Sequence, residues 1–287
     1  MRKYFIFGGA NIDIQAMLSS KARLAESNPS SIKTTFGGVG RNIARAIANY
    51  NSCYFISAFS KSTLFIPLLD DLNQHSVDTT LSKVFKNKDT SMYIDIVDED
   101  GVVIGASDMS LIESLKKEDV KEAVLKTEDN DIIVVEANLP YDVLEYILKN
   151  AKGYKIMDAV SSKKMGKVKE LLILTDLIKL NNLEYNMLKD TKINDYIITY
   201  GNALEIKIGG EKYHITHNKV HSLNPTGCGD TFIGTFAANI NNGLKLAIIE
   251  SIKAAAASAL ILESVPSKED INKITVDDLS IVFEEIK

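Results

Sequence analysis

Cysteine is scarce in this 287-residue sequence, in which only Cys53 and Cys228 occur. Two cysteines cannot build the disulfide framework of a small secreted protein, so we expect a reducing, cytoplasmic setting. Long hydrophobic runs are also missing: no apolar stretch reaches the roughly 20 residues of a membrane-spanning helix, and the first residues show no signal-peptide pattern. The formal net charge of −5 gives no reason to expect nucleic acid or an anionic membrane as a partner.

Two common nucleotide-binding motifs are absent as well. The chain holds no Gly-x4-Gly-Lys-Ser/Thr, which is the phosphate-binding loop of many NTPases. A dinucleotide fingerprint could begin at Gly38 and Gly40, but Ile43 occupies its third glycine position, and no acid that could bind a ribose lies near residues 57–61. A phosphate site in this chain would therefore need another kind of loop.

Strand-like and helix-like segments alternate regularly in the second half of the chain. We expect strands at 132–135, 154–157, 177–180 and 196–199. We expect helices at 117–125, 141–149, 164–172 and 184–188. With a first buried strand at 4–7, this alternation predicts an α/β fold with a doubly wound, mostly parallel sheet and helices on both faces. No linker or repeat interrupts the sequence, so residues 1–287 are expected to form a single domain.

Outside that series, the pattern predicts a strand at 53–58 and a helix at 64–73. Strands at 204–208 and 212–215 read as an antiparallel hairpin joined by two glycines. Helices at 231–240, 244–262 and 277–285 are expected to finish the chain.

A second hairpin is predicted between residues 90 and 107. Its alternating strands flank the acidic, glycine-ended turn at 98–101, which is a good local signal for a hairpin. Such a hairpin can hardly supply a parallel strand to the main sheet, so we expect a flap or an accessory sheet.

The stretch from Asn224 to Phe232 begins with a turn that contains one proline and two glycines. A helix of mostly small, apolar residues is expected to follow the turn. A helix N-terminus attracts anions through its free N–H groups and its dipole. A carboxylate there would repel a phosphate unless it accepts a proton from an attacking hydroxyl, so Asp230 is a candidate base for phosphoryl transfer to an alcohol. The alternative is that Asp230 only caps the helix, while Gly227 and Gly229 make a turn.

Asp13 and Asn42 are further candidates for contact with a ligand. Asp13 follows the first strand, at the end where open parallel sheets hold their ligands, although a turn or cap carboxylate is the alternative. Asn42 lies in the first turn of a helix that follows the glycines of 37–40, which would let a ligand approach closely. The alternative there is a packing turn with a solvated Asn42.

Asn181 and Glu184 could hold water on a magnesium ion, because they lie three residues apart in the first turn of a helix. The alternative is a plain capping box, and both roles are compatible. Thr199 and Gly201 close a strand where the backbone could approach a nucleotide, which is a weak signal. Cys228 could have a depressed pKa at the helix N-terminus, or could simply be a small residue that fills the turn.

Three histidines, His214, His217 and His221, suggest a metal site at first sight. Positions 214 and 217 point to opposite faces of a strand, and no cysteine or acid cluster supports them. A zinc site is therefore disfavoured.

Taken together, three of these motifs resemble the signatures of the ribokinase-like (PfkB-type) carbohydrate and nucleoside kinases. They are residues 37–42, residues 179–184 with the family's Asn-x-x-Glu element, and residues 226–230. The resemblance covers essentially the whole chain in the family's order. It implies a three-layer αβα sandwich with a mostly parallel central sheet, ATP and Mg²⁺ as cofactors, and a small β lid formed by approximately 14–35 and 90–107. A homodimer through the lid and a monomer are equally compatible with it.

The resemblance also implies a role for each matching residue. Asp230 would be the base that deprotonates a primary hydroxyl, and the N–H groups of Gly227, Cys228 and Gly229 would form an anion hole. The substrate would be bound by Asn11, Asp13, Gly37, Gly38, Asn42 and Asn138. The nucleotide would be bound by Asn181, Glu184, Thr199, Gly201, Thr226 and Ala256, with Asn181 and Glu184 holding Mg²⁺ through water.

Two positions depart from the family pattern. Cys228 replaces the usual alanine, and Asn224 replaces the usual aspartate. Asn224 removes a negative charge that many members place near a monovalent-cation site, which argues against activation by K⁺. It does not remove the base.

Within the family, several patterns resemble those of pseudouridine kinases. They are residues 9–13, residues 27–29 ahead of the glycine motif, residues 98–101 before 107–109, and the start at Asn224. This resemblance implies ATP-dependent phosphorylation of the 5′-hydroxyl of pseudouridine. The alternatives are a kinase of ribose, inosine or guanosine, adenosine or ketodeoxygluconate, and a non-catalytic nucleotide or sugar sensor.

Overall fold

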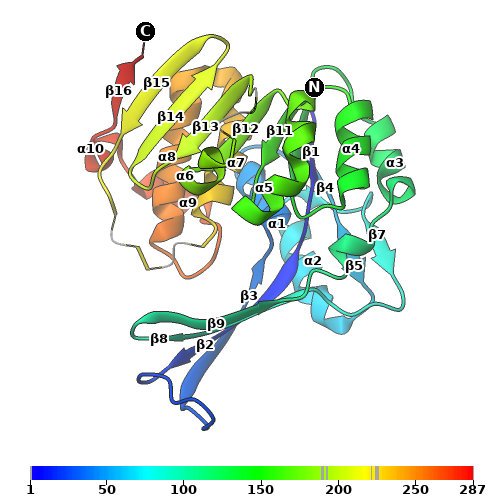
Figure 1. The fold of residues 1–287 in the computed structure, drawn as a ribbon, viewed down its shortest axis with the longest axis vertical. Helices are drawn as coiled ribbons and strands as arrows, with labels where there is room; N and C mark the ends of the chain where they lie inside the picture. Colours follow the sequence, from blue (N-terminus) through cyan, green and yellow to red (C-terminus); the bar gives the residue numbers. More distant parts are fainter. Residues whose placement is uncertain (1, 189–190, 192, 221, 224–225, 287) are drawn as a thin grey trace.

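The computed structural model of the chain contains a central ten-stranded sheet (Figure 1). The structure describes residues 2–188, 191, 193–220, 222–223 and 226–286. The strands lie in the order β16 (Val282–Glu285), β15 (Glu211–Thr216), β14 (Ala203–Ile208), β13 (Asp195–Thr199), β12 (Leu177–Asn181), β11 (Tyr154–Asp158), β10 (Ile132–Glu136), β1 (Tyr4–Phe7), β4 (Cys53–Ile56) and β6 (Val77–Asp78). From β13 to β6 all neighbours are parallel, and β14, β15 and β16 are antiparallel. β1 and β10 are buried along their whole length, as expected for parallel strands covered on both faces.

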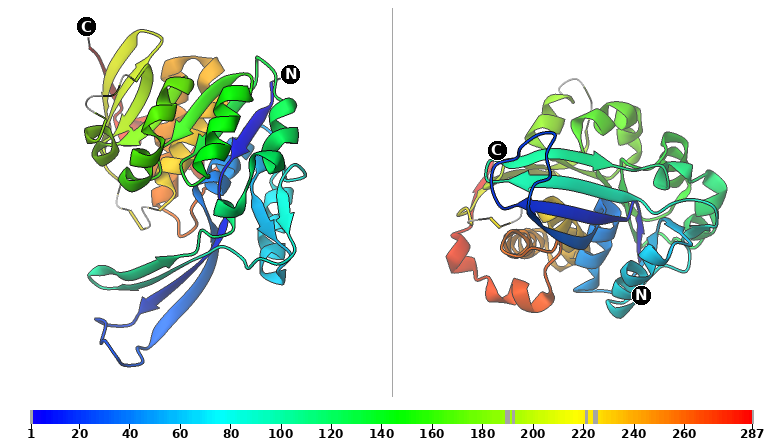
Figure 2. Two further views of the ribbon diagram at one scale, coloured as in Figure 1. Left: turned by 45° about the vertical axis from the view of Figure 1, so that its right-hand side comes forward. Right: turned by 90° about the horizontal axis from the view of Figure 1, so that it is seen from below.

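Helices cover both faces of this sheet (Figure 2). One layer contains α1 (Val39–Ala48), α7 (Cys228–Asn239) and α8 (Leu244–Ala259), with α7 packed between the other two. The other layer contains α3 (Lys117–Leu125), α4 (Tyr141–Asn150), α5 (Ser162–Val168) and α6 (Asn182–Asn186). The predicted three-layer fold with a mostly parallel sheet is therefore confirmed.

The remaining helices lie at the margins of these layers. α2 (Ile66–Gln74) packs beside β6, and α9 (Lys268–Lys273) and α10 (Val276–Leu279) pack against α8. Short 3₁₀ turns occupy Thr63–Phe65, Ile112–Ser114, Lys169–Leu174 and Ile240–Asn242. Within the described part of the chain, no helix has the length and apolar character needed to cross a membrane.

A separate four-stranded sheet projects from the body (Figures 1 and 2). We call it the small sheet. Its strands lie in the order β3 (Ser30–Gly37), β2 (Asn11–Leu18), β8 (Met92–Asp98) and β9 (Gly101–Ser107). β8 and β9 form the hairpin that the sequence predicts, and β8 pairs in parallel with β2. Outside both sheets, β5 (Ala58–Ser60) pairs with β7 (Lys83–Phe85).

The C-terminal helix predicted at 277–285 is wrong. α10 ends at Leu279, because Ser280 adopts a left-handed conformation with φ 47°. The chain then continues as β16, which pairs with β15. The free edge of β15 offers backbone hydrogen bonds to a further strand. Pairing with this edge outweighs the helix propensity of the segment. α9 is missing from the prediction, although Ser267 forms a capping box at its start.

Smaller differences concern where elements begin and end. The predicted strand at 53–58 is divided between β4 and β5, and the helix expected from residue 64 begins with a 3₁₀ turn. The helix expected at 164–172 is α5 followed by a second 3₁₀ turn, and α8 ends at Ala259 rather than at residue 262. These shifts leave the order of the elements unchanged.

Candidate active site

A cavity of about 200 Å³ lies where the small sheet meets the carboxyl ends of β1, β10 and β11. We call it the inner cavity. Seven residues predicted for the site line it: Asn11, Asp13, Gly38, Asn42, Asn138, Thr226 and Asp230. The rest of its wall is formed by Gly9, Ala10, Val39, Ser91, Tyr93, Met109, Ile112 and Val160. The fold thus brings segments from both ends of the chain to one place.

Asp230 lies in the first turn of α7. The helix begins after Gly227, which has a φ of 84° and where a Cβ would overlap the backbone of Ser264, so glycine is required. Because Gly227 is the N-cap, the alternative in which Asp230 caps the helix is wrong. The Asp230 carboxylate lines the inner cavity and accepts a hydrogen bond of 2.9 Å from Nδ2 of Asn42.

A buried ion pair lies near Asp230. Nζ of Lys179 and Oδ2 of Asp158 are 3.0 Å apart, and their side chains are 11% and 2% exposed. Burial and the neighbouring Asp158 raise the pKa of Asp230 to about 6, while Lys179 and the Asn42 hydrogen bond oppose that rise. Such a carboxyl group is ionised at neutral pH and yet more basic than an exposed aspartate, which suits a general base.

The ammonium group of Lys179 also reaches the start of α7. A Cβ placed on Gly229 would lie 2.7 Å from Nζ of Lys179. The first N–H groups of a helix have no intrahelical partner, so the predicted anion hole combines these groups with a buried positive charge. The arrangement can neutralise an anion beside Asp230.

Asp13 lies on β2 and accepts a hydrogen bond from Nδ2 of Asn11. A Cβ on Gly37 would overlap the Asp13 carboxylate, which explains the glycine on the adjacent strand β3. Burial raises the pKa of Asp13 to about 7, and the positive charge of Arg41 works against that rise. Asp13 is therefore a buried carboxyl group whose charge changes near neutral pH.

Glu136 organises the opposite wall of the inner cavity. Its fully buried carboxylate accepts hydrogen bonds from the backbone nitrogen of Gly9 at 2.7 Å and from that of Asn138 at 2.6 Å. Burial raises the pKa of Glu136 to about 7. Oδ1 of Asn138 accepts a hydrogen bond from Lys164, so the other end of this amide is a hydrogen-bond donor.

Glu136, Asp158 and Lys179 are functional candidates for which the sequence predicts no role. Glu136 and Asp158 are the last residues of β10 and β11, and Lys179 lies near the end of β12. A charged residue at the carboxyl end of a buried parallel strand is the signal that identified Asp13. Applied to every strand, the same signal would have found the first two.

A second cavity, of about 290 Å³, lies between α7, α8 and the end of β13. We call it the α7–α8 cavity. Thr199, Gly201 and Ala256, which are predicted for the nucleotide site, line it together with Cys228 and Gly229 of the predicted anion hole. Its other walls are formed by Leu204, His217, Asn218, Lys219, Val220, Ser222, Phe232, Ile252, Ala255 and Ala259. The apolar side chains from α7 and α8 suit a flat aromatic ring.

Asn181 and Glu184 form a complete capping box at the start of α6. Oδ1 of Asn181 accepts from the backbone nitrogen of Glu184, and the Glu184 carboxylate accepts from the backbone and side-chain nitrogens of Asn181. Glu184 is 2% exposed and lines neither cavity. Each carboxylate oxygen accepts one of these hydrogen bonds and keeps a second lone pair, so these residues fit a role in holding water on a magnesium ion.

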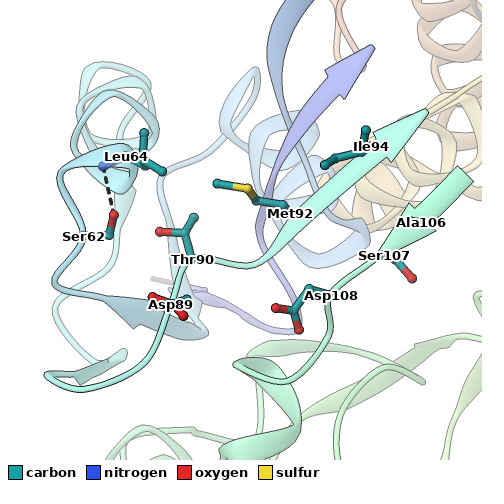
Figure 3. Close-up of a pocket in the computed structure, with 9 residues that line it drawn as sticks. All are labelled: Ser62, Leu64, Asp89, Thr90, Met92, Ile94, Ala106, Ser107 and Asp108. Atoms are coloured by element: carbon teal, nitrogen blue, oxygen red, sulfur yellow. Dashed lines mark hydrogen bonds between the residues drawn. The ribbon is translucent and has the colours of Figure 1, made fainter. Parts of the chain in front are cut away.

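A third cavity, of about 520 Å³, lies on the other face of the small sheet (Figure 3). We call it the outer cavity. Met92 and Ile94 of β8 line it, whereas Ser91 and Tyr93 line the inner cavity. Its other lining residues are Ser62, Leu64, Asp89, Thr90, Ala106, Ser107 and Asp108. None of the predicted site residues lies there.

Asn224, the histidines and Cys228 are the remaining candidates from the sequence. Asn224 and His221 lie outside the described residues. In the described part of the chain, no three His, Cys, Asp or Glu side chains are grouped so as to hold a metal ion. Burial raises the pKa of Cys228, so the depressed pKa considered for this thiol is wrong.

Comparisons with known proteins address the family and the fold of the chain. The family model for pfkB family carbohydrate kinases matches residues 1–272. A pseudouridine kinase of Escherichia coli strain K12 is 28% identical over 271 residues, which are 86% of each chain. The crystal structure of a ribokinase from Cryptococcus neoformans in complex with ADP has a TM-score of 0.81 at 18% identity, covering 95% of this chain and 99% of the other. A structure from Escherichia coli in complex with ATP and Mg²⁺ has a TM-score of 0.81 at 15% identity, covering 95% and 98%.

Proposed function

Because the chain belongs to the pfkB family of carbohydrate kinases, we propose that it transfers the terminal phosphoryl group of ATP to the 5′-hydroxyl of pseudouridine. The position of Asp230 carries this proposal. Its carboxylate lines the inner cavity, and the preceding residue, Gly229, lines the α7–α8 cavity. A hydroxyl in the first cavity and a nucleotide in the second would meet at the first turn of α7.

The chemistry of the proposed reaction follows from this turn. Asp230 accepts the proton of the attacking hydroxyl as its oxygen bonds to phosphorus, and the bond to the leaving ADP oxygen breaks. The first N–H groups of α7, around Gly227, Cys228 and Gly229, and the ammonium group of Lys179 stabilise the charge on the transferred phosphoryl group. Asp13, Asn42 and the backbone at Gly38 hold the sugar.

Two observations support a nucleoside as the substrate. The inner cavity has apolar walls at Met109, Ile112 and Val160 and an aromatic side chain at Tyr93, which suit a flat base more than a second polar sugar. Asn138 presents a donor to this region, which a base carbonyl would accept. The choice of pseudouridine rests on the 28% identical kinase of Escherichia coli and on the sequence patterns shared with that group.

ATP and Mg²⁺ are the proposed cofactors. The ADP and ATP–Mg²⁺ complexes of proteins with the same fold support this assignment. The metal neutralises phosphate charge during transfer, and Asn181 and Glu184 would hold its water molecules. Thr226, Thr199, Gly201 and Ala256 would contact the nucleotide.

The small sheet is the proposed lid, and its outer face the proposed contact with a second copy of the chain. A lid excludes water, which would otherwise compete for the phosphoryl group. The outer face carries Ile32, Ile94 and Ile104, which are 66%, 44% and 61% exposed. A two-fold contact would place this apolar surface against the same surface of a second copy and bury both.

An ATP-consumption assay across pseudouridine, uridine, inosine, guanosine, adenosine, ribose and ketodeoxygluconate tests the proposal. We expect the highest kcat/KM with pseudouridine. A higher kcat/KM for another compound would identify that compound as the substrate and leave the family unchanged. Tight ATP binding without turnover of any compound would favour a sensor and remove the proposed chemistry.

A further inference from the structure

Arg41 lies on α1, directly before Asn42, and is 6% exposed. Its Nη1 donates to Oδ1 of Asn42 over 3.2 Å and to the carbonyl oxygen of Phe36 over 3.0 Å. Its Nη2 donates to Oδ2 of Asp71, on α2, over 2.7 Å. A guanidinium group can hold these three acceptors at once because its donors lie in a rigid, planar fork.

The side-chain amide of Asn42 lies between the Arg41 guanidinium group and the Asp230 carboxylate. With its oxygen toward Arg41 and its nitrogen toward Asp230, the amide makes one hydrogen bond to each. The reversed amide would place nitrogen against the guanidinium group and oxygen against the carboxylate, so two attractive contacts would become repulsive. Arg41 and Asp230 therefore favour the same orientation of the Asn42 amide, with its nitrogen toward Asp230.

We propose that Arg41 is a positioning residue for the base: it orients the amide of Asn42 so that a hydrogen-bond donor holds Asp230. This inference rests on the proposed role of Asp230. Asp71 anchors Arg41, so the chain of contacts runs from Asp71 through Arg41 and Asn42 to Asp230.

Other charged groups near these residues shape the expected pH dependence. Asp158 on β11 and Lys179 on β12 act on Asp230 with opposite sign, and neither contacts Arg41 in the described structure. Arg41 also acts on Asp13, which Asp95 and Asp230 influence in the other direction. A loss of Arg41 should therefore affect substrate binding through Asp13 as well, so the rate is measured at saturating substrate, where a weaker affinity does not lower it.

Arg45 provides a matched control. It lies one turn further along α1, is also 6% exposed, and has its Nε 3.3 Å from the same Asp71 oxygen. No described contact joins it to Asn42. Arg45→Lys is thus the same substitution as Arg41→Lys, at an equally buried residue that pairs with the same acid. It differs in leaving the contacts of the Asn42 amide unchanged.

The experiment measures single-turnover phosphoryl transfer from ATP to pseudouridine, at saturating substrate, as a function of pH. In Arg41→Lys we expect the acidic limb to move up by about one pH unit and the plateau to fall about tenfold, as for the loss of one hydrogen bond to a charged group. Arg45→Lys should keep the wild-type profile. Equal profiles in the two variants, or a lower melting temperature alone, would overturn the inference.

A double-mutant cycle separates this role from general structural support. If Arg41 acts through Asn42, adding Arg41→Lys to Asn42→Ala causes no further shift of the acidic limb, whereas an additive shift contradicts the inference. If Arg41→Lys does not fold, Asp71→Asn weakens the same anchor and should move the limb in the same direction; an unmoved limb counts against the relay. An inactive wild type on every alcohol would instead remove the proposed function, and the base with it.

Discussion

Nδ2 of Asn42 lies 2.9 Å from Oδ2 of Asp230, although 188 residues separate them in the sequence. The pair joins the first turns of α1 and α7, which pack against each other. Both helices begin at a glycine with positive φ, Gly38 at 99° and Gly227 at 84°. Two helix N-termini therefore meet at one carboxylate, and both dipoles favour negative charge between them.

Asp230→Asn should abolish most of the turnover and leave binding in place. The amide keeps the size of the side chain but cannot accept the hydroxyl proton, so kcat should fall by about 10²–10⁴-fold. ATP affinity, measured by calorimetry, should change little because the α7–α8 cavity is intact. Near-normal turnover in this variant would exclude Asp230 as the base.

Asp13 should make substrate capture depend on pH. Its pKa is raised to about 7, so the carboxylate becomes protonated as the pH falls through that value and loses acceptor strength for a sugar hydroxyl. The kcat/KM for the nucleoside should therefore fall below about pH 7. In Asp13→Asn it should be lower by about 10- to 100-fold and should lose this part of the pH dependence. An unchanged KM and kcat would remove Asp13 from the sugar site.

The candidate site was more predictable from the sequence than its electrostatic surroundings. Asp13, Asn42 and Asp230 stand beside glycines or strand ends, so local patterns mark them, and the structure brings all three to the inner cavity. The pairing of Lys179 with Asp158 depends on which strands are neighbours, and that order cannot be read from local periodicity.

The same distinction holds for the fold. The parallel series after residue 115 follows from alternation of buried strands and amphipathic helices, which is a local property. β16 (Val282–Glu285) depends on the free edge of β15, whose residues lie at least 66 positions earlier in the sequence. That edge is available for pairing only once the sheet has formed, so no local pattern in the segment predicts the strand. Helix propensity alone therefore predicted the wrong element there.

Glu136 should make the protein less stable as the pH rises toward neutrality. Its folded-state pKa, raised to about 7, exceeds the ordinary value of 4.5, so the folded state binds the extra proton between these values. The stabilisation is fully present below about pH 4.5 and is lost as the pH rises through about 7, on the order of 3 kcal/mol for this group.

Glu136→Gln tests this contribution. The variant cannot ionise, so its free energy of unfolding in urea should fall less between pH 5 and pH 7.5 than that of the wild type. Its amide has one acceptor oxygen for the two backbone donors at Gly9 and Asn138, so one hydrogen bond is lost at every pH. Identical pH slopes in the two proteins would contradict the prediction.

Lys179→Met should be destabilising and inactive for separate reasons. It leaves Asp158 buried without its ion-pair partner, which costs about 3–5 kcal/mol in typical cases. It also removes the positive charge beside the first turn of α7. Adding Asp158→Asn should restore most of the stability, because the buried charge is gone, but not kcat. Recovery of both together would show that Lys179 matters only for folding.

The outer face of the small sheet should control oligomeric state. Ile104 is 61% exposed and lies on the face that carries Ile94 and Ile32. A lysine at this position would place a charge in the proposed contact between two copies, whose desolvation is costly. Ile104→Lys should therefore be a monomer by sedimentation equilibrium at concentrations where the wild type is a dimer.

Ile173→Lys is the control for this last prediction, because Ile173 is 60% exposed and lies in a 3₁₀ turn of the main body. It makes the same substitution at the same exposure away from the small sheet, so it should stay dimeric. If the lid closes as part of that dimer, Ile104→Lys should also raise the KM for the nucleoside, since the inner cavity shares β8 with the outer face. A monomeric wild type, or a dimer that Ile104→Lys leaves intact, would place any self-association elsewhere on the molecule.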